Sequence, residues 1–252
     1  MNFRIFVLSF LIAFGVVCSV SAQVVNIETK RLGESDKKLI GKTELTVDLI
    51  KSSSTIFTAR NSTQLQYFQE KNTYILLADL NMMQIDTIRY LNNGFMHFRY
   101  NHNFSNKWLV AEAFTQVQFN RVQKIQRRFL WGGGTRFNIL DKEKIKLYAG
   151  TALMYEFELY LNNTYRDKVR MSNYVSFFYK PSATFSIRHT TYYQPQLDGF
   201  MYFRLTNETS VEALIVKNLS FNSKFNYFYD SKPAPAVQKV FFSLTNGLIY
   251  RF

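Results

Sequence analysis

The sequence contains three histidines, and one of them stands in a setting that suggests hydrolytic chemistry. His102 falls on the outward face of a predicted strand and is followed by Asn103. A lipid hydrolase built on this histidine would need a serine nucleophile within hydrogen-bond reach and a third group to orient the imidazole. No serine has a spacing that marks it for this role. His97 is predicted to face inward beside Arg99, and His189 outward.

Metal chemistry has even less support, because no histidine or carboxylate pair has ligand spacing together with a supporting neighbour. We therefore predict no catalytic residue, no metal site and no cofactor. An enzyme that acts on membrane lipid through His102 is kept as an alternative.

A larger group of charged residues recurs at every second position of apolar and aromatic stretches, which places the charges on one face of a strand. If the strands enclose a wet interior, these side chains either pair with one another and fill it or line a narrow pore. Arg99, Arg136, Arg188 and Arg204 would favour anions if the carboxylates left them unneutralised. The inward set is Glu44, Asp48, Arg60, Asp79, Arg99, Glu112, Arg136, Glu156, Glu158, Arg188, Arg204, Glu208, Glu212, Lys224 and Arg251.

Twelve stretches show this alternation. It is clear in 143–158, where Leu147 and Phe157 alternate with Lys146, Glu156 and Glu158. An even number of strands returns both chain ends to the same side of a membrane. The predicted fold is an all-β, transmembrane, up-and-down antiparallel β-barrel. Its strands are expected near 43–51, 54–68, 72–85, 93–104, 107–120, 127–139, 143–158, 169–179, 182–194, 199–216, 219–230 and 237–252.

The N-terminus has the pattern of a secretory signal. Met1–Arg4 is cationic, Ile5–Val17 is largely apolar, and small residues lead to Ala22. Cys18 is the only cysteine, and the residue before it is not the small one that lipidation requires, so the exported chain would carry no disulfide. The predicted divisions are a signal peptide at 1–22, a periplasmic lead-in at 23–42 and the barrel at 43–252.

The composition agrees with an exported barrel. The chain has 25 Phe and 16 Tyr against 4 Pro, and beyond the N-terminus no window approaches the ~20 apolar residues of a membrane helix. The net charge is +13, but the basic residues are scattered singly, so nucleic acid is excluded as a partner. Anionic head groups at the barrel rims explain the charge better. The predicted partners are outer-membrane lipid and lipopolysaccharide, and the barrel-assembly machinery.

The connections are expected to be short on both sides of the membrane, which leaves no room for a plug loop. A two-residue turn at Ser105-Asn106 would set Phe98 opposite Ala113, and Arg99 opposite Glu112. Other tight turns are predicted at Leu140–Lys142, Lys180–Ser182 and Lys217-Asn218. The longer connections are predicted at Asp86–Asn92, Arg121–Gln126, Leu161–Lys168 and Ser231–Ala236.

Glycines cluster at Gly132–Gly134, near Gly150 on the next predicted strand. They predict a bend or bulge that helps the sheet to close. The alternative is that they clear space for a lumen side chain such as Tyr148.

The last strand ends on an aromatic carboxyl terminus, as outer-membrane barrels do. It is predicted to close the barrel against the first strand. Its outward residues Leu248, Tyr250 and Phe252 are predicted to be the signal that the assembly machinery recognises.

Several hairpins resemble a known bacterial family. The stretches HFRYNH, EAFTQVQFN and the RRFL-to-GG segment are similar to the salt-induced outer-membrane proteins, a domain family of unknown function. The Ala22-Gln23 junction also resembles export signals of Bacteroidetes. The resemblance implies an integral outer-membrane barrel and no established activity. Its segments are 65–81, 94–104, 108–122, 127–137 and 148–158.

The sequence therefore predicts an integral β-barrel in the outer membrane of a Gram-negative bacterium. Its function is predicted to be structural, or that of a narrow pore for small solutes and ions with a charged lumen. The alternatives are the lipid-acting enzyme and a surface interaction protein, which the short loops disfavour.

Overall fold

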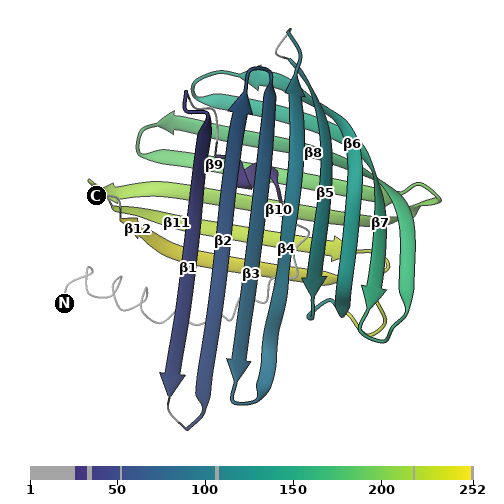
Figure 1. Ribbon diagram of the computed structural model, residues 1–252. Helices are drawn as coiled ribbons and strands as arrows, with labels where there is room; N and C mark the ends of the chain where they lie inside the picture. The colour runs from purple at the N-terminus through teal and green to yellow at the C-terminus, as the bar shows by residue number, and fades with distance from the viewer. Residues whose placement is uncertain (1–25, 33–35, 52, 106–107, 218, 251–252) are drawn as a thin grey trace.

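The computed structural model describes residues 26–32, 36–51, 53–105, 108–217 and 219–250. It forms one sheet in which the strands follow one another in sequence order, and every recorded ladder is antiparallel (Figure 1). The strands are β1 Leu39–Lys51, β2 Thr55–Gln69, β3 Asn72–Ile85, β4 Ile88–Asn103, β5 Leu109–Asn120, β6 Ile125–Asp141, β7 Ile145–Tyr160, β8 Tyr165–Ser182, β9 Phe185–Gln196, β10 Gly199–Val216, β11 Leu219–Asp230 and β12 Val240–Tyr250.

The twelve strands and the up-and-down barrel topology confirm the predicted fold class. The largest differences lie at strand starts: β1 begins at Leu39 rather than 43, and β4 begins at Ile88 rather than 93. Within the described residues, no helix is long and apolar enough to cross a membrane.

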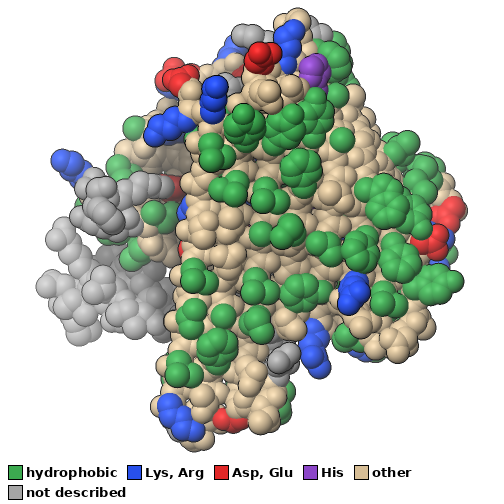
Figure 2. Space-filling model, viewed as in Figure 1, with side chains coloured by type: hydrophobic (Ala, Val, Ile, Leu, Met, Phe, Trp, Pro, Cys, Tyr) green, Lys and Arg blue, Asp and Glu red, His purple; other side chains and the backbone are tan. Residues whose placement is uncertain are grey.

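The two faces of the strands differ as the alternation predicts. On β7, Leu153 is 54% exposed, whereas its neighbour Met154 is 3% exposed. Figure 2 shows hydrophobic side chains spread over the outer face, with charged side chains mainly at its margins. The buried charged residues instead lie on the inner face, among them Arg99 and Glu158. An exposed apolar exterior around a polar interior suits lipid outside and water inside.

The two edges of the sheet are not joined. In Figure 1 β1 runs steeply down the left of the sheet and β12 crosses behind it, and no ladder between the two is present among the described residues. β1 is exposed along almost its whole length. The expectation that the last strand closes against the first is therefore not met among the described residues, where β1 and β12 stand at opposite edges of the sheet.

The β4–β5 hairpin has a different register from the predicted one. Phe98 lies opposite Thr115, and Ala113 lies opposite Tyr100, so the predicted pairing of Phe98 with Ala113 is wrong. The strands separate at Asn103, which pairs with Val110, so the connection is longer than two residues. The shift is two residues, an even number, and each side chain therefore keeps its face.

The β11–β12 connection, predicted as one of the longer links, packs over one end of the barrel. Ala234 is buried with Ile125 and Tyr160, and Val237 packs against them. Arg166 Nη1 also donates to the carbonyl oxygen of Lys232 at 3.0 Å. The apolar residues of this connection pack against apolar side chains of β6 and β7, and this burial holds the loop against the end of the barrel.

The segment Asn26–Leu32, called here the inner segment, lies within the curled sheet and contains a short 3-10 helix, η1, at Glu28–Lys30 (purple in Figure 1). Ile27 is buried against Ile75 and Leu77 of β3, with Phe95 beside them. The sequence predicted that this segment belongs to a periplasmic lead-in outside the barrel, at 23–42. Its apolar residue and its charges instead find partners on the inner face of the strands.

Gly150 on β7 leaves room for an aromatic ring. A Cβ at this position would lie 2.1 Å from the ring of Tyr174 on β8. The alternative interpretation, space for a lumen side chain, therefore holds for Gly150, but the side chain is Tyr174 and not Tyr148. At Gly132 and Gly134 an added Cβ would instead meet the β7 backbone.

Candidate functional site: the charged lumen

The predicted inward charges differ in how far they are buried. Arg60, Glu44 and Asp48 share the inward parity but are exposed. Arg188 lines the largest cavity, and Glu212 is half-buried. Arg251 lies outside the described residues. The residues with ion pairs inside the barrel are Asp79, Arg99, Glu112, Arg136, Glu156, Glu158, Arg204, Glu208 and Lys224.

The first network, called the Glu28 network, joins the inner segment to β4, β5 and β6. Glu28 Oε1 accepts from Arg31 Nε at 2.9 Å and from Arg99 Nη1 at 3.3 Å. Its other oxygen lies 3.2 Å from Arg136 Nη1. Glu112 completes the network, with Arg31 Nη2 at 2.5 Å and Arg99 Nη1 at 3.2 Å. The Arg99–Glu112 pair therefore forms, although diagonally rather than directly across the ladder.

The charge of Glu28 is stabilised by these contacts. Burial by itself would raise the pKa of this carboxyl, but Arg136, Arg31 and Arg99 outweigh it and lower the pKa to about 2. The side chain is therefore a carboxylate at neutral pH.

Two further contacts hold the inner segment. Lys30 Nζ donates to Asp79 Oδ2 at 2.5 Å, and Ser62 Oγ donates to the other oxygen of Asp79 at 2.8 Å. The backbone N–H of Leu32 donates to Gln66 Oε1 at 2.5 Å. The segment is thus tied to β2 and β3 as well as to the Glu28 network, and all of these ties are polar.

The second network, called the Arg204 network, contains four arginines and three carboxylates. Arg204 bonds Glu156, Glu158 at 2.8 Å and Asp230 at 2.8 Å. Glu156 also accepts from Arg170 Nε at 2.5 Å. Glu156 and Glu158 each pair with three arginines, whereas Asp230 pairs with Arg204, so Arg204 is the arginine whose removal breaks the most ion pairs. Its members are Arg128, Glu156, Glu158, Arg166, Arg170, Arg204 and Asp230.

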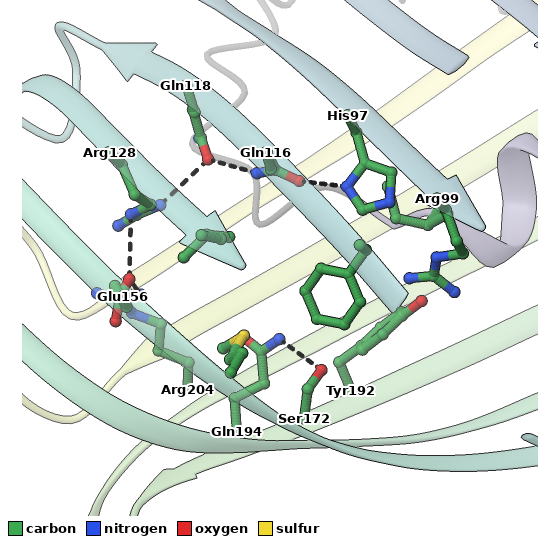
Figure 3. A pocket seen from close by; sticks show the side chains of 14 residues that line it. His97, Arg99, Gln116, Gln118, Arg128, Glu156, Ser172, Tyr192, Gln194 and Arg204 are labelled. Carbon is green, nitrogen blue, oxygen red and sulfur yellow. Dashed lines mark hydrogen bonds and ion pairs between the residues drawn. The ribbon is translucent and has the colours of Figure 1, made fainter. Parts of the chain in front are cut away.

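A row of hydrogen bonds connects this network to His97 along the wall of β5 (Figure 3). Arg128 Nη1 donates to Gln118 Oε1 at 3.3 Å, and Gln116 Nε2 donates to the same oxygen at 3.1 Å. Gln116 Oε1 lies 3.0 Å from His97 Nδ1. Because an amide oxygen only accepts, Nδ1 carries the proton, and neutral His97 presents a lone pair at Nε2.

Cavities follow one another along the interior. The largest, about 550 Å³, borders the Glu28 network and is lined by residues near the β2–β3, β4–β5, β6–β7 and β8–β9 turns. A cavity of about 40 Å³ lies between the two networks. A third, of about 10 Å³, lies under the β11–β12 connection. The two networks and this connection therefore narrow the lumen.

Sequence reasoning missed six members of these networks. Arg128 has the parity of Arg136 on the same strand, and Asp230 has the parity of Lys224, so the alternation alone could have found both. Arg170 lies on the predicted β8 and shares the parity of the buried Ser172. Arg166 stood in a predicted loop. Glu28 and Arg31 stood in the predicted lead-in, where no alternation marks them.

The histidines face as predicted, but their surroundings do not form a catalytic triad. His102 Nδ1 lies 2.9 Å from Asn72 Oδ1, which also accepts from Tyr100. The ring of His102 packs edge-on against Phe104. No serine hydroxyl is among these recorded partners. His189 contacts two threonine hydroxyls.

Twelve antiparallel strands in sequence order, an apolar outer face and a charged inner face define a transmembrane β-barrel. The chain belongs to the family described as "Protein of unknown function, DUF481", whose model matches residues 43–252. This membership of an uncharacterised family confirms what the hairpins indicated.

Two solved structures are remotely similar. The NanC porin has a TM-score of 0.48 and 11% identity, over 85% of this chain and 98% of that one. The outer membrane channel DcaP of Acinetobacter baumannii has a TM-score of 0.38 and 8% identity, over 77% and 84%. No curated protein matches the chain. The fold class rests on the strand order and the two faces of the sheet rather than on these likenesses.

Proposed function

We propose that this protein is an outer-membrane β-barrel whose polar lumen forms a narrow pore for ions and small solutes, closed at rest by the inner segment. The observation that carries the proposal is the Glu28 carboxylate, which lies among Arg31, Arg99 and Arg136 inside the barrel. The segment occupies the lumen without being part of any strand. It can therefore leave without breaking a ladder.

The contacts that hold the segment support such a displacement. Apart from the buried Ile27, the ties are ion pairs and hydrogen bonds, including those of Lys30 with Asp79 and Leu32 with Gln66. Water can replace each of them when the segment moves, whereas an apolar plug would expose its whole packed surface. The cavity of about 550 Å³ provides a polar vestibule on one side of the segment.

The remaining lumen charges indicate a preference for anions. With the inner segment displaced, Arg99 and Arg136 face Glu112 and the Asp79 that Lys30 has left, and the Arg204 network adds four arginines against three carboxylates. An excess of positive charge along a narrow passage favours anions. The Arg204 network would remain as the narrowest part, which limits the passage to small solutes.

Conductance in a planar bilayer tests this proposal. The wild type is expected to open rarely, and Glu28→Gln, which keeps the shape but removes the charge held by the arginines, is expected to open several times more often. Glu44→Gln on the exposed β1 makes the same chemical change without touching the network and serves as the matched control. Under a salt gradient, the reversal potential should lie toward the equilibrium potential of the anion.

The result that contradicts the pore is equally clear. Silent bilayers for the wild type, for Glu28→Gln and for a variant lacking residues 26–32, each shown to be inserted, would leave a structural barrel as the function. In that case the two networks hold the strands in register and nothing passes.

The Gram-negative outer membrane as location, export through residues 1–22, contact with lipopolysaccharide and delivery by the assembly machinery belong to the same proposal. The apolar outer face is evidence for a location in a membrane, and the basic composition is evidence for contact with anionic head groups. A lipid hydrolase at His102 is the weaker candidate, because Asn72 and Phe104 supply neither nucleophile nor base. Turnover of labelled lipid that stops on His102→Ala would favour it instead.

A further inference from the structure

The two lumen networks are not electrically neutral. The Glu28 network has three arginines, Arg31, Arg99 and Arg136, against two carboxylates, Glu28 and Glu112. The Arg204 network has four arginines against three carboxylates. Each network therefore carries one positive charge in excess. An unmatched charge away from water is costly, so a counterion is expected near it.

The cavity of about 40 Å³ between the networks has the groups that such a counterion needs. Three of its lining residues each have a polar atom that makes no hydrogen bond within the described part of the chain: Arg99 Nε, the Tyr192 hydroxyl and His97 Nε2. Their residues are only 4%, 4% and 2% exposed. In Figure 3 the Tyr192 hydroxyl points toward Arg99, and His97 lies beside them. Buried polar groups are rarely left without partners, so these atoms indicate a ligand in the cavity.

The geometry points to a binding site for one small monovalent anion of halide size in this cavity. The Arg99 Nε–H and the Tyr192 O–H both donate, and donors with a nearby positive charge are what an anion requires. Ser172, which also lines the cavity, accepts from Gln194 Nε2 at 3.1 Å and can direct its own proton inward.

His97 fits the same site through a water molecule. The hydrogen bonds of Gln116 and Gln118 fix a proton on Nδ1, so Nε2 of the neutral ring presents a lone pair, which accepts and does not bind an anion directly. A water needs roughly 10–15 Å³ of such space, so the cavity holds about three water-sized groups. One anion and one or two waters fill it, with a water bridging His97 Nε2 to the anion.

The neighbouring cavity is too small to replace this one. The Arg204 network also borders the cavity of about 10 Å³, which has room for about one water. Arg204 and Arg128 line both cavities, and only the larger one adds the unpartnered donors. Arg99 of one network and Arg204 of the other both line the site, so one anion there offsets one of the two excess charges.

Bromide is the probe for this site. Crystals grown in gluconate and soaked in bromide should show an anomalous peak beside Arg99 and Tyr192. In detergent, the melting temperature in gluconate should rise with bromide and then saturate, because a ligand that binds only the folded state stabilises it. Tyr192→Phe should weaken the apparent bromide affinity about tenfold, the loss of one hydrogen bond to a charged group.

Two variants make the test decisive. Tyr174→Phe removes another buried lumen hydroxyl, one that donates to Glu112 and does not line the cavity, so the bromide affinity should change less than about twofold. Gln194→Glu is nearly isosteric and places a fixed carboxylate at the cavity wall. It should raise the melting temperature in gluconate and abolish the response to bromide.

The proposal is overturned if crystals soaked in saturating bromide show only water in the cavity. It is also overturned if Gln194→Glu leaves the bromide response of the melting temperature unchanged. An anomalous peak without saturation or sensitivity to Tyr192→Phe is an adventitious ion only and also counts against it. The site does not depend on conduction. If the barrel binds bromide but passes no current, the pore is refuted and the anion site stands. If it conducts but does not bind bromide, the anion site is refuted and the pore stands.

Discussion

Glu28 Oε1 accepts a hydrogen bond from Arg99 Nη1 at 3.3 Å, although 71 positions separate the two residues in the sequence. This contact places a segment that precedes the first strand inside the lumen. It also sets how the pore is expected to respond to acid.

Acid should release the inner segment only below the ordinary range of a carboxyl group. The pKa of Glu28 is lowered from 4.5 to about 2, so the ionised state stabilises docking above pH 4.5. That stabilisation is lost as the pH falls from 4.5 to about 2. Protease cleavage within the inner segment should stay slow down to pH 4.5 and accelerate below it. Glu28→Gln should cleave quickly and lose this dependence, and a release near pH 6 in the wild type would contradict the assignment.

Removing Arg204 should destabilise the barrel strongly. Arg204→Ala removes the arginine that pairs with the buried Asp230 and takes one arginine each from Glu156 and Glu158. Breaking a buried pair in this way costs about 3–5 kcal/mol. Unfolding by urea in detergent measures it. Lys168→Ala breaks an ion pair with the exposed Asp198 and should cost about 0–1 kcal/mol. Equal costs for the two variants would show that the network adds no stability.

Gly150→Ala should be costly because the new methyl group would overlap the ring of Tyr174. Overpacking of this kind costs about 1–3 kcal/mol. Gly247→Ala on β12 is the matched control, since nothing lies within 4 Å of the Cβ it would add. Combining Gly150→Ala with Tyr174→Leu should recover part of the loss in the same urea measurement. No recovery would mean that the ring is not the obstacle.

In a bilayer β1 and β12 are expected to pair with each other. Backbone groups exposed to lipid must be hydrogen-bonded, and among the described residues no ladder joins the two edge strands. Amide hydrogen exchange along Leu39–Lys51 should therefore be slow in lipid nanodiscs and comparable to that of the interior strand β3. Fast exchange at β1 beside a protected β3 would show an open seam in the membrane.

The C-terminal signal stays a prediction, because the side chain of Tyr250 and the whole of Phe252 lie outside the described residues. Leu248 is 66% exposed on the outer face, where a recognition element must be accessible. Deleting Phe252 should lower the outer-membrane level of the protein severalfold, as measured by fractionation, while Phe252→Tyr should retain it. Normal levels of the truncated chain would rule the signal out.

The sequence by itself determined the faces of the strands. Side chains alternate with a period of two whatever the neighbouring strand, so the inward positions of Glu156, Glu158 and Arg204 follow from local pattern alone. Even the wrong register of the β4–β5 hairpin left Arg99 and Glu112 on the same face, because the error was an even number of residues.

Only the tertiary structure decided what those charges meet. The entry of Glu28 into the lumen, the cover formed by Ala234 and the space that Gly150 leaves for Tyr174 all join residues that no short-range pattern relates. Such contacts depend on the curl of the whole sheet, which brings distant strands around one interior. The sequence therefore determined which side chains enter the lumen, and the curvature of the sheet decided how they close it.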